Sequence, residues 1–147
     1  KVRPSYLGDV NKIKPCYKDD YPRKAYISVS GDDFSAYGWN QLDGLAKKHS
    51  DIIFYAYGNK KPYKFKQKSI IVRGRVSQEV MDKETEDMQI GIRLNQHDGC
   101  SEVVVKAVLR QQVVWSVIEY PFLNMSRQAG RKWLLKNVNK YPWNTKS

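Results

Sequence analysis

The segment Met88–Val117, MQIGIRLNQHDGCSEVVVKAVLRQQVVWSV, decides the fold class that the sequence predicts. Apolar and polar side chains alternate along Met88–Leu94, and apolar residues occupy every second position of Val103–Leu109 and of Val113–Val117. Alternation with a period of two is typical of strands with one buried face. Residues 95–99, NQHDG, contain the Asp-Gly pair that is a strong hairpin signal, and residues 110–112 separate the second run from the third. We therefore expect three consecutive antiparallel strands.

The segments upstream and downstream add further strands and helices. Lys24–Ser30 alternates, and Ile52–Tyr57 is apolar on both faces, as in a central strand. Lys61–Lys68 alternates aromatic residues with lysines, which favours a half-buried edge strand. A 3–4 residue apolar spacing predicts helices over the segments near 34–49 and 123–140. Ser69–Val76 is expected to be a strand, and Ser77–Asp87 a loop or a short helix.

The resulting order is β-α-β-β-β-β-β-α. It predicts an α+β fold in which two helices pack on one face of a mostly antiparallel sheet of five to six strands. Residues 1–23 contain three prolines and no apolar period, so we expect an extended N-terminal arm there and a single α+β domain over 24–147. A chain of 147 residues suits one domain.

Composition excludes several classes of protein. Apolar residues make up 41% and charged residues 28% of the chain, which is globular rather than disordered composition. No apolar run approaches the roughly 20 residues that span a bilayer. We therefore expect no transmembrane segment, and nothing at the amino end resembles a signal sequence.

Positive charge is concentrated in two blocks. The chain has 26 Lys and Arg against 15 Asp and Glu, a formal net charge of +11. Residues 59–76 and residues 122–147 contain basic residues and no acidic one. Clustered positive charge attracts polyanions, although such runs are also common on ordinary solvated faces. The candidate partner-binding residues are Lys60, Lys61, Lys64, Lys66, Lys68, Arg73, Arg75, Arg127, Arg131, Lys132 and Lys136.

Residues suited to catalysis are scarce. His49 is expected to cap a helix end, and His97 lies at the predicted hairpin tip beside Cys100 without a visible orienting partner. Glu102 and Lys106 would lie about 13 Å apart along a strand, which is too far for one metal site. No phosphate loop or dinucleotide fingerprint is present. We accordingly predict no catalytic residue, no metal and no cofactor.

The two cysteines suggest a compartment. Cys16 and Cys100 have no zinc-site spacing, and in an oxidising compartment a disulfide between them would attach the arm to the sheet. The alternative is two unrelated thiols in a cytoplasmic protein. The chain begins at Lys1, which fits a mature exported chain or a trimmed one. A secreted or periplasmic location is the expectation, with the cytoplasm as the alternative.

These observations favour a non-enzymatic binding or scaffold domain. Its basic patches would engage an acidic protein or an anionic envelope component. The alternative is a nucleic-acid-binding protein, including a metal-independent ribonuclease-like toxin, whose candidate residues would be Arg93, His97, Glu102, Arg110 and Glu119. The sequence indicates no oligomeric state.

Overall fold

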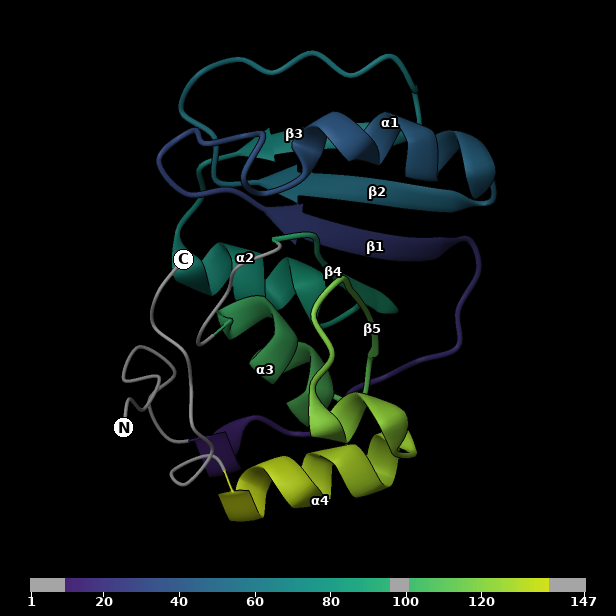
Figure 1. Cartoon of the computed structure of the whole chain (residues 1–147), viewed down its shortest axis with the longest axis vertical. Coiled ribbons are helices and arrows are strands. Elements are labelled where there is room, and N and C mark those ends of the chain that lie inside the picture. Colours follow the sequence, from purple (N-terminus) through teal and green to yellow (C-terminus); the bar gives the residue numbers. More distant parts are fainter. Residues whose placement is uncertain (1–9, 96–100, 138–147) are drawn as a thin grey trace.

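The computed structural model of the chain describes residues 10–95 and 101–137. In this part of the chain, five strands form one sheet in the order β3-β2-β1-β4-β5, with four α-helices in the connections and after the last strand (Figure 1). The strands are β1 Arg23–Ser28, β2 Ile52–Tyr57, β3 Ile70–Gly74, β4 Ile90–Arg93 and β5 Val113–Ser116. The α-helices are α1 Trp39–Lys48, α2 Gln78–Thr85, α3 Glu102–Leu109 and α4 Arg127–Asn137, and short 3-10 turns are η2 Val10–Lys12 and η3 Pro121–Asn124.

The predicted antiparallel sheet with two helices on one face is wrong. Every neighbouring pair of strands in the sheet is parallel. Parallel neighbours cannot be joined by a hairpin, because the chain must return to the same end of the sheet before the next strand begins. The predicted hairpin between Met88–Leu94 and Val103–Leu109 is therefore also wrong, and residues 96–100 of its turn lie outside the described part of the chain.

The decisive error concerns the residues Val103–Leu109, which form most of α3 rather than a strand. All seven are buried, so this helix has no solvent-facing stripe to mark its 3.6-residue period. An apolar run of this length fits a buried strand and a buried helix equally well. Ser101 caps the helix, because its Oγ accepts a hydrogen bond from the Val104 N–H over 3.2 Å.

The predicted edge strand Lys61–Lys68 is a loop. Asp43 on α1 holds it, since its Oδ1 accepts hydrogen bonds from the N–H groups of Lys66 at 2.9 Å and Gln67 at 3.0 Å. The rings of Tyr63 and Phe65 pack against Trp39, with ring centroids 5.4 and 5.5 Å from its own. The aromatic side chains of this segment thus pack toward the core and its lysines face solvent, although the segment is not a strand.

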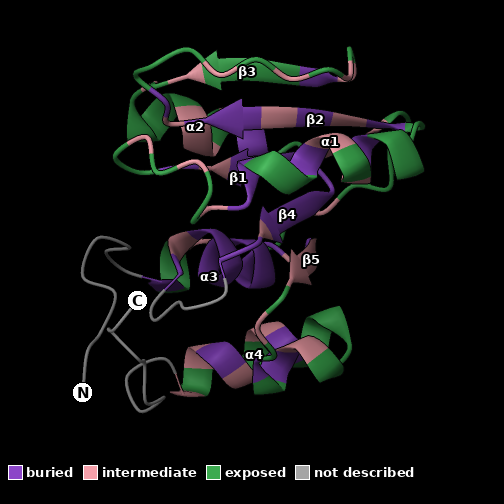
Figure 2. Ribbon diagram, turned by 45° about the horizontal axis from the view of Figure 1, so that its top comes forward, coloured by how far each residue is buried: buried purple, intermediate pink, exposed green. Residues whose placement is uncertain are grey.

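Helices cover both faces of the sheet. Ala25 and Ile27 of β1 point to one face, where they pack in one cluster with Trp39 and Leu42 of α1. Tyr26, between them, points to the other face and packs near α3. The regular alternation of strand side chains explains this division. On the α3 side a further cluster joins α3 to α4 through Leu134, and Figure 2 shows the nearly continuous burial of α3.

Residues 10–22 contain the short turn η2 and no strand. The N–H groups of Cys16 and Tyr17 donate hydrogen bonds to the Arg110 carbonyl at 3.1 and 3.2 Å. Arg131 of α4 donates from Nη2 to the Ile13 carbonyl at 2.9 Å. This segment is therefore attached to the end of α3.

The strand order reverses direction once. The chain builds outward from β1 through β2 to β3, then crosses back through α2 to place β4 on the other side of β1. In open parallel sheets the two connections leaving such a point diverge, which leaves a crevice outside the carboxyl ends of the strands. In this chain that crevice lies beside the ends of β1 and β4.

Candidate site at the carboxyl edge of the sheet

A cavity of about 790 Å³ occupies this crevice. Its floor and rim come from the carboxyl ends of four strands: the segment 28–31 after β1, the Tyr57-Gly58 pair, the segment 75–77 and Arg93. Side chains of α2 and α3 form its walls. The fold therefore brings residues far apart in the sequence to one edge of the sheet.

Backbone contacts fix the strand ends that form the rim. The Gly58 N–H donates to the Gly74 carbonyl at 2.8 Å, and the Val29 N–H donates to the Tyr57 carbonyl at 3.0 Å. Gly58 has a φ of 100°, and a Cβ added there would lie 2.2 Å from the Val29 carbonyl oxygen. Only glycine fits at this position. Asp32 accepts hydrogen bonds on Oδ1 from the N–H groups of Lys60 and Lys61, in the loop that follows β2.

The charged lining of the cavity is more basic than acidic. Among the described residues, four cationic side chains line it, Arg75, Arg93, Lys106 and Arg110, against the two carboxylates Asp82 and Glu102. The described lining thus has a formal excess of two positive charges. A concave, partly dry surface with such an excess raises the local concentration of anions.

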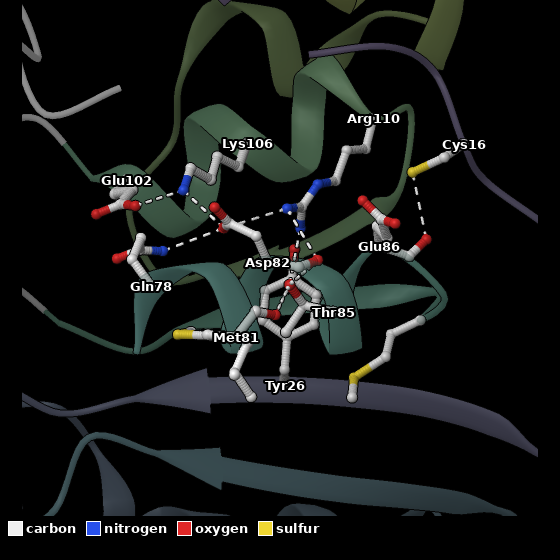
Figure 3. Close-up of polar contacts among 12 residues, drawn as sticks. Cys16, Tyr26, Gln78, Met81, Asp82, Thr85, Glu86, Glu102, Lys106 and Arg110 are labelled. Atoms are coloured by element: carbon white, nitrogen blue, oxygen red, sulfur yellow. Dashed lines mark hydrogen bonds and ion pairs between the residues drawn. The ribbon is translucent and has the colours of Figure 1, made fainter. Parts of the chain in front are cut away.

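Asp82 of α2 is the centre of the inner polar network (Figure 3). Its Oδ1 lies 2.7 Å from Lys106 Nζ and 3.4 Å from Arg110 Nη2, and it accepts a hydrogen bond from Gln78 Nε2 at 3.1 Å. Lys106 Nζ also lies 2.6 Å from Glu102 Oε2, one helical turn earlier on α3. These contacts place two cations and two carboxylates in alternation along the wall of the cavity.

Arg110 also reaches the base of α2. Its Nη1 donates to Thr85 Oγ1 at 2.9 Å, and that hydroxyl donates in turn to the Met81 carbonyl at 2.7 Å. Gln112 continues the polar layer, because its Nε2 donates to the carbonyls of Thr85 at 2.8 Å and Met88 at 2.9 Å. The end of α2 is therefore held by hydrogen bonds from the segment that follows α3.

Tyr26 supplies a neutral donor beneath this network. Its hydroxyl donates to Gln112 Oε1 at 2.6 Å. Burial raises the pKa of Tyr26 to about 12, and the nearby Arg110 only partly opposes this effect. The phenol is therefore protonated at neutral pH and adds no negative charge to the lining of the cavity.

A second group of polar contacts holds α2 to the ends of β2 and β3. Tyr57 Oη donates to Glu84 Oε1 at 2.7 Å, and Arg73 Nε donates to the same oxygen at 3.0 Å. The hydrogen bonds from Arg73 and then Tyr57 lower the pKa of Glu84. Burial and the bond to the carboxylate raise the pKa of Tyr57. Glu84 is therefore ionised at neutral pH, with both partners protonated.

Two further arginines line the cavity. Arg93, the last residue of β4, has its guanidinium carbon 5.1 Å from the ring centroid of Tyr37. Arg75 follows β3, is exposed, and has no hydrogen-bond or ion-pair partner among residues 10–95 and 101–137. Neither guanidinium group contacts Asp82, whose partners are Lys106, Arg110 and Gln78.

The two basic blocks predicted to bind a partner lie at opposite ends of the molecule. The loop between β2 and β3 lies at one end of the long axis and α4 at the other (Figure 1). Of the eleven candidates, Arg75 alone lines the cavity. The exposed ones are Lys60, Lys61, Lys64, Lys66, Lys68, Arg73, Arg75, Arg127, Lys132 and Lys136. The described parts of the two blocks therefore do not form one continuous patch.

Three of the arginines in those blocks have partners within the fold. Arg73 contacts Glu84, Arg127 lies 4.1 Å from the ring centroid of Tyr17, and Arg131 donates to the carbonyls of Ile13 and Leu109. Their positive charge therefore supports tertiary contacts as well as the basic surface.

Several residues that line the cavity are ones for which the sequence indicated a different role. Glu102 and Lys106 were rejected as a metal site on the expectation of a strand, and on α3 they are one turn apart and form an ion pair. Arg93, Glu102 and Arg110, candidates for the ribonuclease alternative, all line the cavity. Asp82 was missed as a functional candidate, and no local motif points to it.

The remaining ribonuclease candidates do not join this group. Glu119 is not in the lining, and His97 lies outside the described residues. Within residues 10–95 and 101–137, no three His, Cys, Asp or Glu side chains are grouped so that they could hold a metal ion. None of the helices in that part of the chain is long and apolar enough to cross a membrane.

Cys16 forms no disulfide with any residue in the described part of the chain. Its Sγ donates to the Glu86 carbonyl at 3.2 Å, and burial raises its pKa. Cys100 lies outside the described residues, so the disulfide between the two stays a prediction.

Neither a protein-family model nor a curated protein sequence matches this chain.

Proposed function

We propose that this domain binds a phosphate-bearing small molecule of nucleotide size in the carboxyl-edge cavity. The observation that carries the proposal is the position of a basic cavity at the point where the strand order reverses. Open parallel sheets bind their ligands in this crevice, and nucleotides are frequent occupants of it. The resemblance to such folds is architectural, so the proposal depends on the residues of the cavity itself.

The size and charge of the cavity both favour this class of ligand. Its volume of about 790 Å³ lies within the range of roughly 300–1,000 Å³ that is usual for small-molecule sites. A diphosphate group would offset the formal excess of two positive charges in the lining. An uncharged ligand would leave that excess without compensation in a partly buried space.

Arg75 and Arg93 are the proposed phosphate-binding residues. Guanidinium groups present paired donors that match phosphate oxygens, which favours arginine over lysine for this role. The segment 28–31 contributes only small side chains beside them, so a ligand can approach the backbone closely. Lys106 and Arg110 lie deeper and already have carboxylate partners.

The larger partners expected from the sequence remain proposals. An acidic protein or an anionic envelope component would meet two separated basic regions rather than one face, which gives less support than the cavity does. The exported location also stays a prediction. Single-stranded nucleic acid is favoured by one specific observation, the exposed lysines of residues 60–68 beside Tyr63 and Phe65, although both rings are partly buried against Trp39.

Equilibrium binding of ADP, GDP, CDP, UDP and pyrophosphate at low salt tests the main proposal. We expect saturable binding of at least one probe, reduced about tenfold in Arg75→Gln and in Arg93→Gln, because each loses a charge-assisted hydrogen bond. Lys64→Gln combined with Lys66→Gln is the matched control, because it removes positive charge outside the cavity. The proposal is wrong if no probe saturates, or if the control loses as much affinity as the arginine variants.

Single-stranded RNA tests the alternative separately. If the lysine-rich loop binds RNA, the affinity should fall steeply with salt and should be lost in Lys64→Glu combined with Lys66→Glu. An affinity that this double variant leaves unchanged would exclude the loop as the RNA-binding surface.

A further inference from the structure

We infer that Lys106 and Arg110 form a second, inner anion site. The Asp82 carboxylate occupies this site until a phosphate of the ligand displaces it. This inference rests on the proposed function, since it concerns the same cavity. It adds a regulatory element, because the domain would carry its own competing anion on α2.

The two cations are unusually buried for residues of their type. The side chain of Lys106 is 10% exposed and that of Arg110 is 6% exposed. Removing an ammonium and a guanidinium from water is costly unless an anion accompanies them. Both line the cavity and both approach the same oxygen, Oδ1 of Asp82 (Figure 3). The fold therefore keeps two buried positive groups directed at one anionic position.

The anion that occupies this position belongs to a weakly buried helix. The side chain of Asp82 is 37% exposed, and Thr85 is the one buried residue of α2. Val80 is 42% exposed. Most of what holds α2 is the set of side-chain hydrogen bonds and ion pairs already described, with Met81 adding a partly buried apolar contact. Displacing Asp82 would therefore cost little apolar burial.

The cations belong to a helix that cannot move as easily. All residues from Val103 to Leu109 are buried, and α3 packs against β4, β5 and α4. Lys106 also keeps Glu102 as a partner if Asp82 leaves. An incoming phosphate would therefore take the place of Asp82 on a fixed pair of donors, and α2 would be the element that adjusts.

A purely structural network gives a different expectation. In that case Asp82 serves only to attach α2 to α3, and removing its charge weakens the fold without improving anion binding. In the displacement case, removing the charge eliminates a competitor, so the affinity for an anion rises.

Pyrophosphate binding to Asp82→Asn distinguishes the two cases. We expect this variant to bind pyrophosphate about tenfold more tightly than the wild type, because the amide cannot compete as an anion. Glu79→Gln is the matched control, since Glu79 is an exposed carboxylate on the same helix outside the cavity lining. An unchanged or weaker affinity in Asp82→Asn, or an equal gain in Glu79→Gln, overturns the inference.

Amide hydrogen exchange of the wild-type chain gives a second readout that needs no variant. We expect saturating pyrophosphate to lower the protection of the amides in residues 81–86, because the helix loses its contact with Lys106 and Arg110. Unchanged or increased protection overturns the inference even if Asp82→Asn fails to fold.

The outcomes separate this inference from the proposed function. Nucleotide binding that depends on Arg75 and Arg93, with no gain in Asp82→Asn, supports the proposed function and removes the inner site. Pyrophosphate binding that improves in Asp82→Asn but does not depend on Arg75 or Arg93 supports the inner site and removes the proposed phosphate-binding residues.

Discussion

The Tyr57 hydroxyl donates a hydrogen bond of 2.7 Å to Glu84 Oε1, which links the carboxyl end of β2 to α2. Arg73, near the end of β3, donates to the same carboxylate. The ends of β2 and β3 are thereby joined to α2, the helix that forms one wall of the cavity. The position of α2 depends on polar contacts at both of its sides, from Glu84 toward the sheet and from Asp82 toward α3.

Replacing Tyr57 with Phe should weaken the attachment of α2. The ring of Tyr57 is 1% exposed, so the variant keeps its apolar burial and loses only the bond from the hydroxyl. We expect the free energy of unfolding to fall by about 1.5–3 kcal/mol, the usual range for a hydrogen bond to a charged group. Urea denaturation measures it. Tyr55→Phe, the same change two residues earlier, should stay within about 0.5 kcal/mol of the wild type.

The Glu84 carboxylate should make stability depend on acid pH. Its pKa is lower in the folded chain than the usual value of 4.5, so the folded state favours the ionised form. This contribution is fully present above the unfolded pKa and is lost as the pH falls through the folded pKa. We expect the urea midpoint of the wild type to fall between about pH 5 and pH 3 more steeply than that of Glu84→Gln.

The control for this pH dependence is a carboxylate on the same helix without such partners. Glu79→Gln should keep the wild-type slope, because Glu79 is exposed and lies outside the Arg73 contact. Parallel curves for the wild type and Glu84→Gln would show that the ion pair has no net effect on stability.

Arg131 and Lys132 should differ sharply although they are adjacent in one basic block. Arg131 donates to the carbonyls of Leu109 at 2.8 Å and Ile13 at 2.9 Å, whereas Lys132 is exposed. Arg131→Gln should lower the free energy of unfolding by about 1.5–3 kcal/mol, because two partly buried carbonyls lose a charged donor. Lys132→Gln should change it by less than about 0.5 kcal/mol. Equal effects in thermal unfolding would contradict a structural role for Arg131.

Local patterns predicted several elements of the fold. The strand Ile52–Tyr57 has the predicted bounds, because a strand covered on both faces is apolar throughout and ends at a glycine. The first strand and the last one also lie where alternation placed them, and the acidic segment after Ser77 contains α2. Each of these signals depends on neighbours in the sequence.

The direction of strand pairing could not be obtained in the same way. The predicted pairing direction depended on the interpretation of Val103–Leu109. Because all of these residues are buried, the helix has no polar face that would distinguish its sequence pattern from that of a strand. That single error produced a hairpin and an antiparallel sheet. The signal that favoured the helix was Ser101 before Glu102, since a capping serine followed by an acidic residue is typical of a helix start.

The candidate site was hidden for a related reason. Asp82 and Lys106 are 24 positions apart in the sequence and meet only because α2 and α3 lie on the same side of the sheet. Once the sheet is known to be parallel, the reversal of strand order predicts a crevice at the ends of β1 and β4. The basic blocks indicated a binding surface on the exterior of the protein. Most of the cationic side chains that line the cavity, Arg93, Lys106 and Arg110, lie outside those blocks.

Alanine substitutions at Gly58 and at Gly44 test whether the rim of the cavity tolerates an added Cβ. A Cβ at Gly58 would lie 2.2 Å from the Val29 carbonyl oxygen, and its φ of 100° is unfavourable for any other residue. We expect Gly58→Ala to lower the free energy of unfolding by more than about 2 kcal/mol and to weaken ligand binding at the cavity.

Gly44 lies in α1, where an added Cβ would meet nothing within 4 Å. Gly44→Ala should therefore raise the free energy of unfolding by up to about 1 kcal/mol, since alanine is the better helix former. Opposite signs in urea denaturation support the close approach of β1 and β2 at the cavity, and a tolerated alanine at residue 58 would show that the rim can shift.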